Sequence, residues 1–230
     1  MSTSNLKLRM EDLVNNPTAR VPICLCLDVS GSMYGDPIDE LNEGVRAFYQ
    51  ELRDDEVAQY AAEISIVTFG GDAECIEDFA NIERQTNIPD LEADGGTPMA
   101  EAVDMALDML EARKQEYKDK GVDYYQPWLV MMTDGYPTSS NSDLQAAIDR
   151  TVDLVGNKKL TVFPIAVGDD ADMDVLASFS PKRRPLRLQG LMFKEFFVWL
   201  AQSVIQTSNS MPGEEIPLDI EGLKGWASLS

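Results

Sequence analysis

The chain has 230 residues, of which 44% are hydrophobic and 26% are charged, proportions that are typical of a globular protein. This composition excludes a disordered chain, a collagen-like chain and a disulfide scaffold. The chain has 19 Lys and Arg residues and 40 Asp and Glu residues, so its net charge is −21, which excludes nucleic acid and anionic membrane surfaces as expected partners. It contains no His, so the most common general base and the most common zinc ligand are absent.

The first half of the sequence predicts strands that alternate with helices. A nearly continuous apolar run over residues 21–29 predicts a strand that is buried on both faces. A helix follows, with Asp36 as its N-cap. Residues 64–69 predict the next strand, and residues 74–79 predict a short strand that forms a hairpin with it. A long helix with an apolar stripe then begins near Met99.

The second half repeats this alternation. We expect, in order, a strand at 128–132, a helix capped by Asn141 or Ser142, a strand at 160–167, a short helix at 172–178, a weak edge strand at 186–188 and an amphipathic helix from Phe193. The tail from residue 208 is predicted to pack as irregular chain around Trp226. Lys182, Arg183 and Arg184 form a basic cluster that is expected in a solvated loop, with an acidic partner as the alternative.

This order of elements predicts an α/β fold with a mostly parallel sheet and helices on both of its faces. We divide the chain into an N-terminal extension at 1–17, one domain at 18–207 and a C-terminal tail at 208–230. The N-terminal segment is charged and has no apolar core, so no signal peptide is expected. The odd number of cysteines indicates a reducing compartment, which favours the cytoplasm, and Cys24 and Cys26 are interpreted as small buried apolar residues rather than a redox pair.

Oxygen-bearing side chains gather where ligands bind in open α/β sheets, beyond the carboxyl ends of strands. Asp28, Ser30 and Ser32 follow the first strand, Thr97 begins the long helix, and Asp134 follows the strand at 128–132. Hard oxygen ligands without His or Cys suit Mg²⁺ or a similar cation. If the three hydroxyl groups bind directly, the two aspartates can act through water. The ion then keeps much of its charge and an open position for an acidic side chain from a partner.

The pattern Asp28-x-Ser30-x-Ser32, then Thr97, then Asp134 in a Thr-Asp-Gly turn resembles the metal-ion-dependent adhesion site of von Willebrand factor A domains. The resemblance covers roughly residues 18–207. It implies a Rossmann-like, doubly wound sheet of six strands with one antiparallel edge. It also implies a divalent metal, Mg²⁺ with Mn²⁺ or Ca²⁺ as alternatives, that is bound directly by the two serines and, depending on state, by the threonine. A partner protein supplies the last, acidic ligand.

Within that superfamily, the start of the first strand, the segment Gly95-Gly96-Thr97-Pro98-Met99 and the Pro-Leu-Asp…Gly-Trp tail resemble bacterial TerY-like proteins. This resemblance implies a role in tellurite resistance or stress response, with kinase and phosphatase partners. Tyr34, Asp36 and Asp94 are expected to border the site.

Three functions are weighed. The favoured hypothesis is a non-catalytic, metal-dependent protein-interaction module. The alternative is a partner subunit of an ATPase complex. A Mg²⁺-dependent phosphohydrolase with Asp28 as nucleophile is less favoured, because the aspartyl-phosphate pattern needs a second acid at position 30, where this chain has Ser30.

Overall fold

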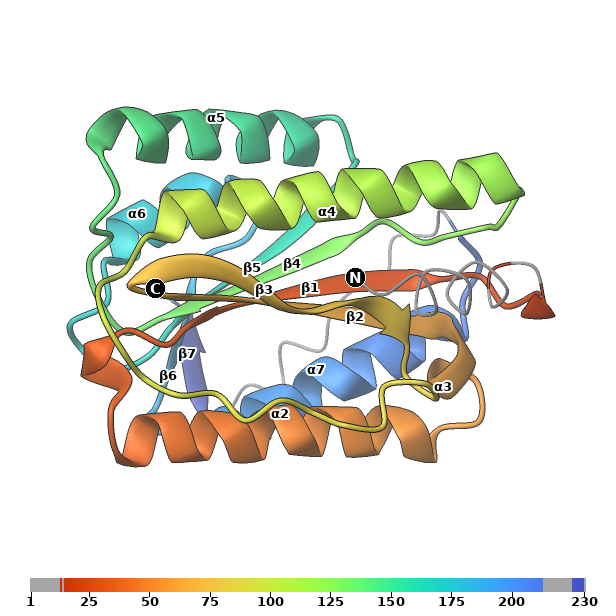
Figure 1. The fold of residues 1–230 in the computed structure, drawn as a ribbon, viewed down its shortest axis with the longest axis horizontal. Coiled ribbons are helices and arrows are strands. Elements are labelled where there is room, and N and C mark those ends of the chain that lie inside the picture. The colour runs from red at the N-terminus through yellow and green to blue at the C-terminus, as the bar shows by residue number, and fades with distance from the viewer. Residues whose placement is uncertain (1–12, 14, 213–224, 230) are drawn as a thin grey trace.

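The computed structural model describes residues 13, 15–212 and 225–229, and in this part of the chain a seven-stranded sheet lies between two layers of helices (Figure 1). The strands are β1 (Val21–Asp28), β2 (Ala62–Gly70), β3 (Asp72–Asn81), β4 (Trp128–Thr133), β5 (Thr161–Ala166), β6 (Leu186–Leu188) and β7 (Ala227–Leu229). The predicted alternation of strands and helices is therefore confirmed, and so is the α/β class.

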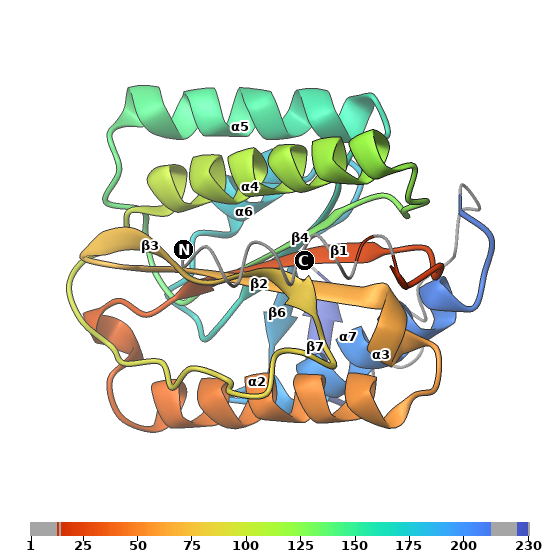
Figure 2. The ribbon, with the colours of Figure 1, turned by 45° about the vertical axis from the view of Figure 1, so that its right-hand side comes forward.

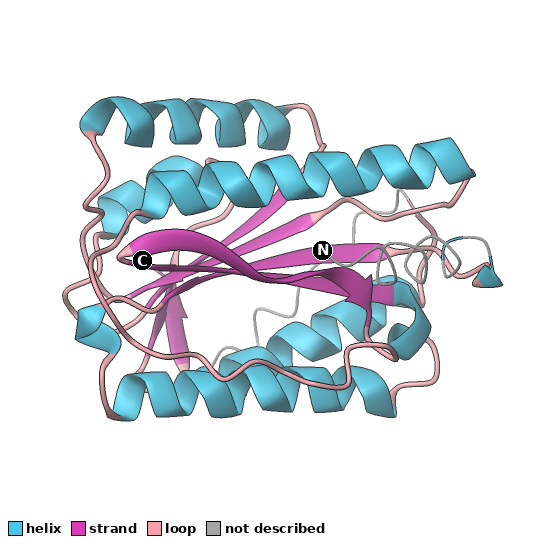
Figure 3. Ribbon diagram, viewed as in Figure 1, coloured by secondary structure: helices cyan, strands magenta, loops and turns pink. Residues whose placement is uncertain are grey.

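Helices cover both faces of the sheet. They are η1 (Gly31–Met33), α2 (Asp36–Asp54), α3 (Ala58–Ala61), α4 (Met99–Lys120), α5 (Asn141–Gly156), α6 (Met173–Phe179) and α7 (Phe193–Ser208). Figure 2 and Figure 3 show α4, α5 and α6 on one face and α2, α3 and α7 on the other. The two short helices η1 and α3 were not predicted from the sequence, because three or four residues are too few to show a helical period.

The sheet has the order β3-β2-β1-β4-β5-β6-β7. The pairs from β2 to β6 are parallel, whereas β3 is antiparallel to β2 and β7 is antiparallel to β6. The described residues thus form seven strands with an antiparallel strand at each edge, where the resemblance implied six with one. The predicted edge strand β6 is internal, because β7 covers it.

The seventh strand corrects the prediction of an irregular tail. The Trp226 ring lies 5.8 Å from the Trp199 ring and 6.1 Å from the Phe196 ring, so the residue before β7 is anchored on helix α7. Burying a large aromatic side chain supplies the free energy that holds a three-residue strand in place. The remainder of the tail, at 213–224, and most of the predicted N-terminal extension, at 1–12 and 14, lie outside the described residues.

Strand β1 divides the interior into two cores, because its side chains alternate between the faces. Ile23 and Leu25 pack with the α2 and α7 side, whereas Cys24 and Cys26 pack with the α4 side. Both thiols are buried and reduced, and burial raises the pKa of Cys24 to about 12. The structure therefore favours the interpretation of these cysteines as packing residues.

Two helix starts differ from the sequence prediction by one residue. Asp36 was expected as an N-cap but is the first residue of α2, and Gly35 with its φ of 89° occupies the cap position. At α5 the cap is Ser140 rather than Asn141 or Ser142, since its hydroxyl accepts a hydrogen bond of 3.2 Å from the Asp143 N–H. Runs of hydroxyl and acidic residues offer several equivalent caps, so the pattern alone does not select one.

A buried charge cluster lies at the amino ends of β1 and β2. The Glu63 carboxylate accepts hydrogen bonds from Arg20 Nε at 3.1 Å, Arg113 Nε at 2.6 Å and the Tyr117 hydroxyl at 2.5 Å. All four side chains are essentially inaccessible to solvent. Burial alone would lower the pKa of Arg113, but the Glu63 charge raises it above its usual value. The cluster joins β1, β2 and α4.

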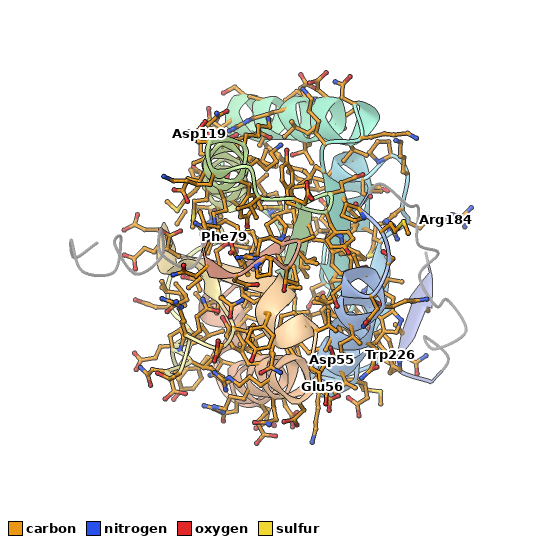
Figure 4. All side chains as sticks on the ribbon, turned by 90° about the vertical axis from the view of Figure 1, so that its right-hand side faces the viewer. Asp55, Glu56, Phe79, Asp119, Arg184 and Trp226 are labelled. Carbon is orange, nitrogen blue, oxygen red and sulfur yellow. The ribbon has the colours of Figure 1, made fainter. Side chains whose placement is uncertain are left out.

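The basic cluster is largely engaged with the protein itself. Lys182 Nζ donates to the Val155 carbonyl at 3.0 Å, near the end of α5. The Arg183 guanidinium lies 5.0 Å from the centre of the Phe163 ring, and burial lowers its pKa. Figure 4 shows Arg184 projecting away from the body of the protein. Two of the three basic side chains of this loop therefore contact the rest of the protein.

None of the helices in the described part of the chain combines the length and apolar character that crossing a bilayer requires.

Candidate metal centre

The sheet topology brings two of the predicted site segments together. Strands β1 and β4 are parallel neighbours, with Leu27 opposite Met132, so Asp28, the last residue of β1, and Asp134, which follows β4, lie at the same carboxyl end of the sheet. This is the left-hand end of the sheet in Figure 1, where β1 runs into the short helix η1. The crossover order β2-β1-β4 makes this end the point at which neighbouring connections diverge to opposite faces, which is where open α/β sheets bind ligands.

Asp28 is fixed at the base of this site. Its side chain is fully buried, its Oδ1 accepts a hydrogen bond of 2.8 Å from the Ser30 N–H, and its Oδ2 accepts one from the Thr133 hydroxyl. Burial raises the pKa of Asp28 although these hydrogen bonds act in the opposite direction, and the nearby charge of Asp134 adds to the increase. A buried carboxylate beside a second carboxylate is stabilised by a cation.

Three further side chains form a chain of hydrogen bonds above Asp28. The hydroxyl oxygens of Ser30 and Ser32 are 3.1 Å apart, and the Ser32 hydroxyl donates to Asp134 Oδ1 at 2.8 Å. This last bond connects the loop after β1 directly to the loop after β4. Burial also raises the pKa of Asp134, with a contribution from the charge of Asp170.

Thr97 is brought to the site through its backbone. The Thr97 N–H donates to the Thr138 hydroxyl at 3.0 Å, which ties it to the loop after β4. On the other side, the Gly31 N–H donates to the Gly95 carbonyl at 2.9 Å, and the Asp94 N–H donates to the Val29 carbonyl at 2.8 Å. The Thr97 loop is therefore held between the loops that carry the other four residues, and its side chain is buried.

Gly95 permits this close approach. Its φ is +70°, and a Cβ at this position would lie 2.4 Å from Gly71 Cα. The Gly71 N–H also donates to the Gly96 carbonyl at 2.9 Å, so the β2–β3 turn supports the loop from behind. Any residue with a side chain would separate these two backbones and move Thr97.

Three residues position the site although they were not predicted from the sequence. Thr133 holds Asp28, Thr138 holds Thr97, and the Ser139 hydroxyl accepts a 3.0 Å hydrogen bond from the Ala100 N–H at the start of α4. Thr138 and Ser139 belong to a run of hydroxyl residues at 138–140, between β4 and α5, which was not assigned any role from the sequence, and Thr133 was noted only as the first residue of the Thr-Asp-Gly turn.

The donor chemistry fits a hard divalent cation. The candidate ligands offer hydroxyl and carboxylate oxygens, with no nitrogen or sulfur among them, which matches the preference of Mg²⁺, Mn²⁺ and Ca²⁺. Across the described residues there is no group of three or more Asp, Glu, His or Cys side chains arranged to hold a metal. The centre is thus hydroxyl-rich, with only two carboxylates among its five predicted residues.

Comparison with known proteins agrees with this architecture. A family model described as "von Willebrand factor type A domain" matches residues 23–194. The human inter-alpha-trypsin inhibitor heavy chain H6 is 23% identical over 176 residues, which are 73% of this chain and 13% of that protein. An uncharacterised protein of Synechocystis sp. is 24% identical over 185 residues, which are 78% of this chain and 40% of that protein.

Solved structures share the fold. A von Willebrand factor type A protein from Catenulispora acidiphila superposes with a TM-score of 0.60 at 17% identity, over 82% of this chain and 43% of that one. At this identity the likeness concerns the fold alone. The chain also spans less than half the length of the two curated relatives that it matches.

Proposed function

Because the chain belongs to the von Willebrand factor type A domain family, we propose that it binds a partner protein through a divalent cation held at the carboxyl end of its sheet. Domains of this family commonly mediate metal-dependent protein interactions. For this chain the proposal rests on one observation, the continuous set of contacts that connects Asp28, Ser30, Ser32 and Asp134 across two loops.

We assign Ser30, Ser32 and Thr97 as direct ligands and Asp28 and Asp134 as the negative charges behind them. Thr133 fixes the orientation of Asp28, and Ser32 fixes that of Asp134. Since hydroxyl groups are neutral, such a ligand set leaves much of the ion's charge unbalanced. A bound Mg²⁺ would supply an electrophilic centre for a carboxylate of the partner.

The geometry supports an interaction module better than a phosphohydrolase. A nucleophilic carboxylate needs an oxygen that is free to attack, whereas both oxygens of Asp28 accept hydrogen bonds and the side chain is buried. The neighbouring position that would carry a general acid is Ser30. We therefore assign Asp28 a positioning role.

The metal assignment is tested by titrating Mg²⁺ and Mn²⁺ into the protein by calorimetry. Asp28→Ala and Asp134→Ala should each weaken binding by about 10–100-fold, because groups that orient metal ligands typically have effects of that size. Asp36→Asn is the matched control, since it removes a charge at the border of the site without removing a proposed ligand. Equal affinities in all four proteins would contradict the assignment.

Partner dependence is tested by pull-down with Mg²⁺ and with EDTA. We expect partners that are retained with Mg²⁺ and released by EDTA, and we expect Thr97→Ala to lose the same partners while its unfolding midpoint stays close to that of the wild type. Partners that persist in EDTA would contradict a metal-bridged contact. An unfolded Thr97→Ala variant would show that Thr97 is a structural cap instead.

The TerY-like setting, with stress or phosphorylation-linked signalling in the cytoplasm, remains a prediction from the sequence motifs. It specifies kinase or phosphatase components as the partners to look for in the pull-down.

A further inference from the structure

Two large exposed aromatic side chains belong to the loops that carry the candidate metal ligands. Among the described residues, the most exposed aromatic side chains are Tyr34, with 80% of its surface accessible, and Tyr136, with 67%. Tyr34 lies two residues after Ser32, and Tyr136 lies two residues after Asp134. Because Ser32 and Asp134 are joined by a 2.8 Å hydrogen bond, the two loops that carry these tyrosines meet at the candidate site.

The fold does not need these two rings in its core. Tyr34 follows η1 and Tyr136 lies in the loop after β4, and neither residue belongs to either hydrophobic core. Exposed tyrosines are common anchors of protein interfaces, because the ring supplies contact area at little cost in conformational entropy.

The loops around the tyrosines carry charge of a single sign. Five loops reach this end of the sheet, at 28–36, 70–72, 94–98, 134–140 and 168–172, and they contain no Lys or Arg. Their acidic residues are Asp28, Asp36, Asp72, Asp94, Asp134, Asp169, Asp170 and Asp172. From outside these loops, Arg187 of β6 donates to the Gly168 carbonyl and lies 3.7 Å from Asp169. Most of the rim carboxylates, including Asp36, Asp72 and Asp94, are exposed.

This charge distribution limits what can approach the metal. A single divalent cation offsets two charges, so an acidic partner segment would still meet the repulsion of the surrounding aspartates. A partner segment must therefore offer a carboxylate to the cation and also be attracted by the surrounding aspartates. A segment that carries one carboxylate between Arg or Lys residues does both. Its carboxylate reaches the cation, its basic groups pair with the rim aspartates, and guanidinium groups stack on the tyrosine rings.

We propose that Tyr34, Tyr136 and the aspartate rim form a docking surface for a basic partner segment that presents a single Asp or Glu to the metal. This inference rests on the proposed function, because it takes the cation as the receptor for the carboxylate. It adds the chemical class of the partner, namely a cationic segment rather than an acidic one, and names two anchor residues outside the metal ligands.

The test uses three fluorescent peptides and the full chain. The first is Gly-Arg-Arg-Glu-Arg-Arg-Gly, the second replaces its Glu by Gln, and the third replaces its four Arg by Ser. Fluorescence anisotropy with Mn²⁺ should show the tightest binding for the first peptide and at least about tenfold weaker binding for the other two, and EDTA should weaken the first as strongly as the Gln replacement does. Higher ionic strength should weaken the first peptide most, because its contacts with the rim are exposed and screened by salt.

Variants then test the tyrosines. Tyr34→Ala and Tyr136→Ala should each weaken the first peptide about two- to fivefold, the range of an exposed cation–π contact, and the corresponding Phe variants should restore it. Tyr60→Ala is the matched control, because Tyr60 is an exposed tyrosine on α3, at the opposite end of the sheet. All three Ala variants should keep the wild-type affinity for Mn²⁺.

The outcomes separate the two proposals. If the wild-type chain binds no Mn²⁺, the proposed function fails and the docking surface fails with it. If Mn²⁺ binds but the Ser peptide binds as tightly as the Arg peptide, or the tyrosine variants bind like the wild type, only the docking surface is overturned. Sedimentation that shows self-association lost in Tyr136→Ala would also overturn it, because the occupant would then be a second copy of the chain.

Discussion

The buried cluster around Glu63 allows a quantitative prediction about stability. In the variant Glu63→Gln, the side chain keeps its size but loses the charge that faces Arg20 and Arg113. Both guanidinium groups would stay buried without their shared counterion. Removing one partner from a buried ion pair costs about 3–5 kcal/mol, because the remaining charge has lost its hydration and gains nothing in return.

The structure supports a value within this range. The Glu63 carboxylate is inaccessible to solvent, and both of its oxygens are used, Oε1 by Arg20 and Oε2 by Arg113 together with Tyr117. Neither arginine is left without a hydrogen-bond partner by the change, since Arg113 also contacts Glu116 and Arg20 also donates to the carbonyl oxygens of Asn16 and Thr18, which limits the loss. Tyr117→Phe removes only the hydroxyl and should cost about 1.5–3 kcal/mol, the range for a hydrogen bond to a charged group.

Equilibrium unfolding in urea measures both effects. With a slope of about 2–3 kcal/mol per molar urea, a loss of about 3–5 kcal/mol in Glu63→Gln should lower the midpoint by about 1–2.5 M. The control is Glu56→Gln, an exposed side chain between α2 and α3 that Figure 4 labels at the surface, and its midpoint should match that of the wild type. A loss below about 1 kcal/mol in Glu63→Gln would refute the argument, because it would mean that water reaches the cluster in the folded protein.

Two further predictions concern the loops and the thiols. Gly95→Ala should destabilise the protein by more than about 2 kcal/mol and weaken Mn²⁺ binding, because it combines a positive φ with a backbone clash. The control is Gly121→Ala, which has a similar φ of +66° but open space around it and should cost only about 1 kcal/mol. Equal losses of stability for the two variants in urea unfolding would contradict the clash at Gly95. Alkylation of the folded protein should modify Cys75, which is exposed, and should spare Cys24 and Cys26 of β1, which are buried. Burial also raises the pKa of Cys24 to about 12, so this thiol stays protonated and unreactive. Mass spectrometry that finds more than one modified thiol would contradict this prediction.

Much of the fold was predictable because it depends on local pattern. The run of apolar residues in β1 and the helical periods of α2 and α4 are strong signals, and all three elements begin within a residue of the predicted positions. Strand β7 was not predictable, since three residues have no period and their pairing depends on where Trp226 packs. Tertiary contacts rather than propensity determine such a strand.

The candidate site shows the same division. The predicted residues could be chosen because strand ends carry hydroxyl and carboxylate side chains at short spacings. The residues that hold them could not be chosen in this way, because Thr133, Thr138 and Gly95 act through hydrogen bonds and close packing between loops far apart in the sequence. The comparisons show the von Willebrand factor type A family and its fold, but they do not show the TerY-like subfamily.

The position of β7 at the edge of the sheet has a practical consequence for producing this protein. A product that stops before residue 225 would lose the strand and the Trp226 ring together, leaving β6 with unused hydrogen-bonding groups beside a bare aromatic surface on α7. Exposed strand edges and apolar patches of this kind promote aggregation, so we expect a lower yield of the truncated protein. An affinity tag is therefore better placed at the start of the chain, away from strand β7.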